Sequence, residues 1–167
     1  MLPDVSDADL HKQYQFGRSV RDKATEANTA VIAIRRVKAQ LVQRLTKAAD
    51  DAALKSTGET LKTNASTVEE TVYQVRNQSG QDPLNFPIKV NNRIANLLSM
   101  SERGDGPPNN SMPEIFSILT KELKGYTDKL DIVWKTDLAA VNKELARLKL
   151  PPLDPNCTKV EGCVVVP

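Results

Sequence analysis

The chain is poor in the residue types that most catalytic and metal sites require. Its 167 residues include one histidine, two cysteines and one tryptophan, and only 4% are aromatic. So few histidines and cysteines exclude a zinc finger and the paired Glu-x-x-His motifs of a di-iron bundle. The scarcity of aromatic residues disfavours a β-sandwich or barrel, whose strands draw on aromatic and β-branched side chains.

The sequence also lacks a strong charge bias and a long apolar run. It has 23 lysines and arginines against 21 acidic residues, a net charge of +2, which is too balanced to predict nucleic-acid binding. No stretch reaches the ~18 apolar residues of a spanning helix, so we expect no membrane insertion. No Gly-rich phosphate loop is present. We therefore expect no enzyme activity in this chain and no cofactor or metal.

What the sequence does contain is helical periodicity. Apolar residues recur at spacings of three and four, with a predicted break at Thr57-Gly58. The predicted helices cover residues 6–49, 54–76, 88–100 and 111–150. Two long helices, one of medium length and one short predict an all-α fold, an antiparallel bundle of about four helices. The alternative is a three-layered bundle in which the short helix stacks end to end on another.

Local signals mark where the predicted helices begin and end. Ser6 and Ser111 each precede an acidic residue by three positions, which is the pattern of a capping box. Pro87 fits the first turn of the short helix, where its missing N–H costs nothing. Pro151 ends the last helix. Gly125, inside that helix, is interpreted either as a weak point or as a site of close contact.

The helical pattern delimits one domain. Residues 1–5 are predicted to be a disordered start, residues 6–153 a helical bundle domain, and residues 154–167 an irregular C-terminal tail. The tail contains Cys157 and Cys163, separated by five residues. Two interpretations stay open for this pair: a small disulfide loop in an exported protein, or two free thiols.

The connection between the second and third predicted helices is unusually rich in polar side chains. The candidate binding residues there are Asn77, Gln78, Asp82, Asn85, Asn91, Asn92 and Arg93. One interpretation is that the amides cap two helix ends and satisfy the backbone of the loop. The other is that they form a polar docking surface.

The same connection resembles a known family. It contains Asn-Gln-Ser-Gly-Gln-Asp-Pro-Leu-Asn at residues 77–85 and Asn-Asn-Arg-Ile at residues 91–94. These strings resemble the C-terminal helical region of large bacterial proteins with sortilin-like BNR-repeat β-propellers, often labelled glycosyl hydrolases. Residues 6–10 and 150–153 fit the same region, so the resemblance covers residues 6–153.

The resemblance implies an exported parent protein, periplasmic or secreted, in which this chain is a C-terminal appendage. The family's propeller repeats contain Asp-box hairpins, Ser-x-Asp-x-Gly-x-Thr-Trp, and this string is absent from the sequence. No catalytic residue is therefore carried over. We predict a non-catalytic helical domain that packs against, stabilises or dimerises the β-propeller region of the parent polypeptide. Two alternatives are an accessory domain that contributes substrate contacts to a carbohydrate-active glycosyl hydrolase, and a standalone adaptor that self-associates as a homodimer.

Overall fold

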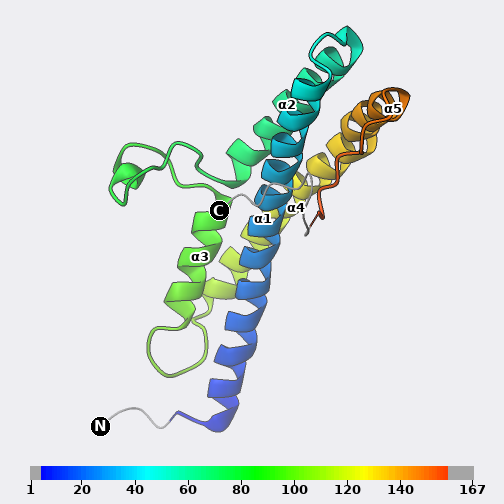
Figure 1. Cartoon of the computed structure of the whole chain (residues 1–167). Helices are drawn as coiled ribbons and strands as arrows, with labels where there is room; N and C mark the ends of the chain where they lie inside the picture. Colours follow the sequence, from blue (N-terminus) through cyan, green and yellow to red (C-terminus); the bar gives the residue numbers. More distant parts are fainter. Residues whose placement is uncertain (1–4, 158–167) are drawn as a thin grey trace. The chain divides into compact units, whose positions relative to one another are not determined.

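The computed structural model describes residues 5–157, apart from the side chain of Pro83. Its regular elements in that range are all helical: α1 (Asp7–Lys47), α2 (Ala52–Val72), α3 (Val90–Ser101), α4 (Ser111–Val133) and α5 (Ala139–Arg147). A 3₁₀ turn, η1 (Asp82–Leu84), lies between α2 and α3, and a π-helical turn, η2 (Trp134–Leu138), joins α4 to α5 (Figure 1). The predicted all-α bundle of about four helices is confirmed, with η2 dividing the last predicted helix.

The chain divides into two compact units. Unit 1 contains Met1–Asn28 and Val72–Gly125, and unit 2 contains Thr29–Thr71 and Tyr126–Pro167. Unit 1 therefore comprises the N-terminal part of α1, α3 and most of α4. Unit 2 comprises the rest of α1, α2, and the remainder of the last helix with the segment after it. Each unit combines three helical segments around its own apolar core.

In unit 1, α3 runs antiparallel to its two neighbours. Gln13, near the start of α1, donates from Nε2 to the carbonyl of Ser101 at the end of α3 (2.9 Å). Arg93, near the start of α3, forms an ion pair with Glu122 of α4. The buried apolar side chains of the unit are Val20, Ala27, Val72, Val90, Ile94, Leu97, Met112, Leu119 and Leu123.

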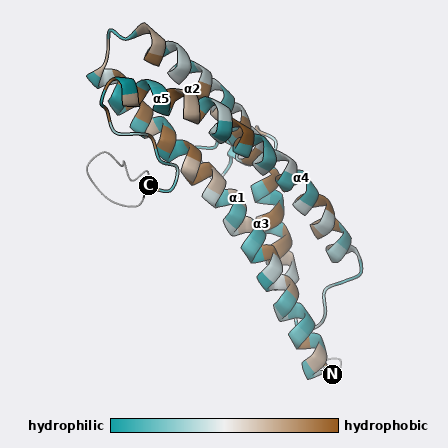
Figure 2. Ribbon diagram, turned by 90° about the vertical axis from the view of Figure 1, so that its right-hand side faces the viewer, coloured by the Kyte–Doolittle hydropathy of each residue, from teal (hydrophilic) through white to brown (hydrophobic). Residues whose placement is uncertain are grey.

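In unit 2, α1 and α2 form the antiparallel hairpin that their short connection predicts. The predicted break at Thr57-Gly58 is wrong, because α2 continues through both residues. Gly58 lies close to α1: an added Cβ would stand 3.1 Å from Leu41 Cδ1. Along each helix, hydrophobic residues alternate with hydrophilic ones (Figure 2). The buried apolar side chains of the unit are Val31, Ile34, Val37, Leu41, Leu54, Leu61, Ala65, Val68, Leu130, Val133, Leu138, Val141, Leu145 and Leu153.

One predicted cap is confirmed and the other is wrong. Ser6 Oγ accepts a hydrogen bond from the N–H of Asp9 (3.2 Å), as a residue that caps α1 should. At α4 the capping side chain is Asn109, whose Oδ1 accepts from the N–H groups of Ser111 (3.2 Å) and Met112 (3.1 Å). Ser111 is already the first residue of α4, so it cannot cap that helix itself.

The connection between α2 and α3 is longer than predicted. Helix α2 ends at Val72 and α3 begins at Val90, so Pro87 does not lie in the first turn of a helix. Buried Gln74 bonds to the backbone of this connection near its start and near its end. Its Nε2 donates to the carbonyl of Pro87 (2.9 Å), and its Oε1 accepts from the N–H of Arg76 (3.3 Å).

The π turn η2 corrects the register of the last helix. After Val133 the next buried apolar residue is Leu138, five positions on. A regular α-helix would place Asp137 at this inward position, but a π turn adds one residue and turns Leu138 inward. Asp137 instead accepts a hydrogen bond from Asn64 Nδ2 of α2 (2.7 Å). This turn was not predicted from the sequence, although the step of five between apolar residues was its signal.

After α5 the chain forms an irregular segment, residues 150–157, which we call the C-terminal strap. Gln40 holds the strap by donating to the carbonyl of Asp154 (2.8 Å) and accepting from its N–H (3.0 Å). Asn142 pairs in the same way with the backbone of Leu153 (3.0 and 2.7 Å). The first residues of the predicted tail are therefore bonded to the fold of unit 2.

The ends of the chain carry two further predictions. Cys157 is disulfide-bonded. Its predicted partner, Cys163, lies outside the described residues, as do residues 1–4 of the predicted disordered start. The Cys157–Cys163 pairing and the disorder of the start stay predictions.

Candidate interaction surface

In unit 1, residues 73–89 connect α2 to α3 and are called the crossing segment. Asp82 organises its turn: the carboxylate accepts from the N–H of Gln78, from the N–H of Ser79 (2.7 Å) and from Ser79 Oγ (3.0 Å). These donors, with the Gln78 N–H foremost, hold the pKa of Asp82 below its usual value. The N–H of Asn85 donates to the Asp82 carbonyl (2.9 Å). The predicted site residue Asp82 is thus a structural residue of the loop.

The ordered turn presents apolar side chains outward. Leu84, at the end of η1, is 85% exposed, and Ile88 is about half exposed. The guanidinium of Arg76 lies over the ring of Phe86, 5.8 Å from its centroid, an arrangement in which the cation is attracted to the ring face. The crossing segment therefore has polar bonds within it and a leucine at its outer surface.

Three predicted binding residues have buried amide oxygens. The Oδ1 atoms of Asn77, Asn91 and Asn92 are buried, and none has a hydrogen-bond partner within residues 5–157. Nor do these amides cap α3: its capping position is Lys89, which makes no side-chain capping bond. The backbone of the loop is satisfied in part by Asp82 and Gln74, so the amide-capping interpretation does not apply at α3.

The last predicted binding residue, Arg93, belongs to a different feature. Besides pairing with Glu122, it borders a groove of about 280 Å³, which we call the α3–α4 groove. The groove is lined by Arg93, Asn96, Leu97, Met100, Ile115, Ile118 and Leu119. This groove was not predicted from the sequence. Its signal was a second apolar stripe, Ile115 and Ile118, beside the core positions of α4.

In unit 2 the charged side chains that are buried serve the packing of helices. Glu69 of α2 is only 4% exposed, and it accepts from Arg35 Nε (2.7 Å) and Lys38 Nζ (2.9 Å) of α1. Arg44, also buried, donates from Nε to the carbonyl of Pro151 in the strap (3.0 Å). A general base must reach its substrate, whereas Glu69 is enclosed by the two helices that it joins.

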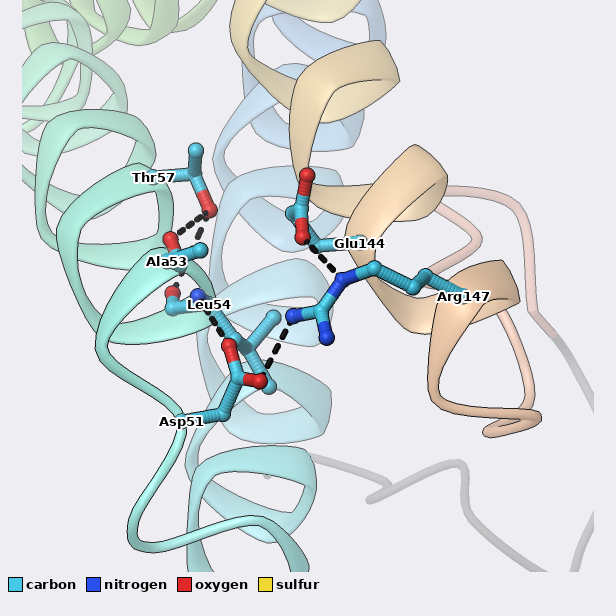
Figure 3. Close-up of polar contacts among 6 residues, drawn as sticks. All are labelled: Asp51, Ala53, Leu54, Thr57, Glu144 and Arg147. Carbon is cyan, nitrogen blue, oxygen red and sulfur yellow. Dashed lines mark hydrogen bonds and ion pairs between the residues drawn. The ribbon is translucent and has the colours of Figure 1, made fainter.

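A second polar contact of unit 2 joins α2 to α5 (Figure 3). Asp51 caps α2 by accepting from the N–H of Leu54 (2.8 Å), and its other oxygen accepts from Arg147 Nη2 (2.6 Å). Arg147 also donates from Nε to Glu144 (2.7 Å). The Arg147 guanidinium, together with the Leu54 N–H, lowers the pKa of Asp51, and the two carboxylates raise that of Arg147.

The residue types that carry most enzyme chemistry do not converge in this part of the chain. His11 is exposed, and its Nε2 lies 2.7 Å from Nε2 of Gln15. Between residues 5 and 157, no group of three or more histidine, cysteine, aspartate or glutamate side chains could hold a metal ion. The crossing segment and the α3–α4 groove are two features of unit 1 that expose apolar side chains.

No protein-family model, curated protein or solved structure matches the chain. The family resemblance centred on residues 77–85 therefore stays a prediction. None of the described helices combines the length and the apolar character needed to cross a membrane.

Proposed function

We propose that this chain is a non-catalytic helical domain that binds another protein region through the crossing segment. The observation that carries the proposal is the 85% exposure of Leu84 on a turn whose backbone is bonded to Asp82. An apolar side chain presented at a fixed position loses little conformational freedom on binding. Leu84 therefore has the properties of an anchor residue, and half-exposed Ile88 lies four residues further along the same segment.

The partner we propose is the β-propeller region of an exported parent polypeptide. This part of the proposal rests on the family resemblance, whose most specific string, residues 77–85, is the stretch that forms the turn around η1. The disulfide bond of Cys157 supports an extracytoplasmic location, because disulfides persist in oxidising compartments. The enclosure of Glu69 and Arg44 in the packing of unit 2 supports a role in binding and stabilisation and not in catalysis.

The test uses the joined polypeptide. The DNA upstream of the Met1 codon is sequenced, and a frame that continues into Asp-box repeats is expressed whole, with a protease site inserted before residue 1. After cleavage we expect the helical domain to stay bound to the propeller on a sizing column. Leu84→Ser should release it. Ile132→Ser is the matched control, because Ile132 is also a well-exposed apolar residue, at 60%.

Three results would contradict the proposal: an upstream frame without a propeller, separation of the wild-type parts after cleavage, or retention that Leu84→Ser leaves unchanged. If the parts separate but hydrolysis of a sugar polymer by the propeller depends on the helical domain, the carbohydrate-accessory alternative is favoured. That result would direct attention to Asn77, Asn91 and Asn92.

A further inference from the structure

The α3–α4 groove of unit 1 is a separate apolar surface, and its use does not depend on the proposed function. Leu97 and Leu119 are buried and form its base, whereas Met100, Ile115 and Ile118 are 42, 42 and 56% exposed. Single exposed apolar residues are ordinary on protein surfaces, but several around one groove are typical of an interaction site.

Two charged residues flank the exposed ridge of α4. Glu114 lies four residues before Ile118 and Lys121 three residues after it, and both are exposed. Because a helix turns about 100° per residue, the two charges lie on the same side of Ile118. They are offset from it along the axis by about 6 and 4.5 Å in opposite directions. Among the ion pairs of the described residues, none involves Glu114 or Lys121.

This arrangement is complementary to itself when reversed. Consider a two-fold axis that is perpendicular to α4 and passes beside Ile118. It places an antiparallel copy of the helix opposite the first. The flank that carries Glu114 and Lys121 then lies against the same flank of the copy. Glu114 of one copy then lies opposite Lys121 of the other, and the pairing occurs twice. In a parallel two-fold arrangement the flank that carries Glu114 and Lys121 would lie on opposite sides of the interface in the two copies, so neither pair could form.

We infer that the α3–α4 groove binds a second copy of this chain, forming a symmetric dimer in which the α4 helices pack antiparallel about Ile118. Ile118 of each copy packs against Ile118 of the other at the axis, and the two apolar grooves, lined by Met100 and Ile115, face each other. The two Glu114–Lys121 pairs determine the direction of packing. The dimer leaves the crossing segment available for a different partner.

The dimer is tested by sedimentation velocity of the full chain over a range of concentrations. We expect wild type to show a monomer–dimer equilibrium and Ile118→Asp to remain monomeric, because a buried unpaired charge opposes association. Ile132→Asp, on the same helix, is the matched control and should dimerise as wild type does. Circular dichroism spectra of all variants check that the helices are intact.

A charge exchange tests the direction of packing. Glu114→Lys alone and Lys121→Glu alone each place like charges together twice, and each should weaken the dimer about tenfold or more. The double variant Glu114→Lys/Lys121→Glu restores both pairs and should recover the wild-type dissociation constant.

Four results overturn the inference. They are a wild-type chain that is monomeric at every concentration, a dimer that survives Ile118→Asp, a dimer lost with Ile132→Asp, and a double charge variant that stays as weak as the single ones. The last of these excludes antiparallel packing about Ile118 even if a dimer exists. None of these results tests the propeller proposal, which depends on the effect of Leu84→Ser on binding to the propeller.

Discussion

The two units differ in what they do with their polar and apolar side chains. In unit 2 the buried charged and amide groups find partners between helices or in the strap: Glu69 with Arg35 and Lys38, and Gln40 with Asp154. In unit 1 three asparagine oxygens are buried without a hydrogen-bond partner among the described residues, and its loop and groove expose apolar side chains such as Leu84.

This difference indicates a division of roles. Unit 2 satisfies its polar groups within the fold, so changes to them should act mainly on stability. Unit 1 has the outward anchor and the apolar groove, so changes to these should act mainly on association.

The largest effect is expected from Glu69→Gln in unit 2. The amide keeps the shape but loses the charge that Arg35 and Lys38 bond to, so the free energy of unfolding should fall by about 1–3 kcal/mol. Urea denaturation measures the change. Glu70→Gln is the control, because Glu70 is exposed and should change stability by less than about 0.5 kcal/mol. Equal effects at the two positions would refute the role assigned to Glu69.

The strap gives a smaller and more local effect. Gln40→Ala removes both hydrogen bonds to the backbone of Asp154 and should lower the free energy of unfolding by about 1–2 kcal/mol. Hydrogen exchange should become faster at the Asp154 N–H. It should change little at the Leu153 N–H, because that group still donates to Asn142 Oδ1. Gln15→Ala, at an exposed position, should leave both rates unchanged. Unchanged exchange at Asp154 in the Gln40 variant would show that the strap is held by other contacts.

Replacing a helical glycine by alanine in each unit should change the free energy of unfolding by a smaller amount, and differently in the two units. A Cβ at Gly125 of unit 1 meets no atom within 4 Å, so the predicted close contact is absent there. Gly125→Ala should therefore raise the free energy of unfolding by about 0.5–1 kcal/mol through better helix propensity. Gly58→Ala in unit 2 should gain less or destabilise, because the new Cβ would lie 3.1 Å from Leu41 Cδ1. Thermal melts rank the variants, and a larger gain at Gly58 would contradict the close approach of Gly58 to Leu41.

The smallest effect is confined to acid pH and compares one carboxylate from each unit. The pKa values of Asp51 and Asp82 are lowered from 3.8, so their contacts stabilise the fold fully above that value. This stabilisation is lost as the pH falls through the folded-state pKa. Asp51→Asn and Asp82→Asn should each flatten the decline of the melting temperature between about pH 5 and 2. A variant whose curve parallels wild type would show that the carboxylate titrates alike in both states.

Much of the fold follows from the local pattern of the sequence. The apolar rhythm predicted α1 nearly to the residue, because the stripe from Val20 to Leu41 repeats without a proline. The cap at Ser6 was also predictable, since it needs only residues three positions apart. Asn109 was missed as the cap of α4 because Ser111 and Glu114 match the same short pattern, and the choice depends on where the chain enters the helix.

The candidate surfaces were predictable only in part. The sequence marked the polar crossing segment, yet its candidates separate in the structure: Asp82 organises the loop, and Arg93 pairs with Glu122. Leu84 could not be recognised as an anchor, because a leucine in a loop is apolar whether it packs inward or outward. Its exposure depends on how Asp82 and Gln74 turn the backbone around it.

Composition and apolar spacing by themselves determined that this protein is all-helical and where most helices lie, because helix formation and amphipathic burial depend on residues three and four positions apart. Tertiary structure alone decided the close approach at Gly58, the enclosure of Glu69 between α1 and α2, and the direction in which Leu84 and Ile118 point. Each of these depends on groups distant in sequence that meet only when the helices pack.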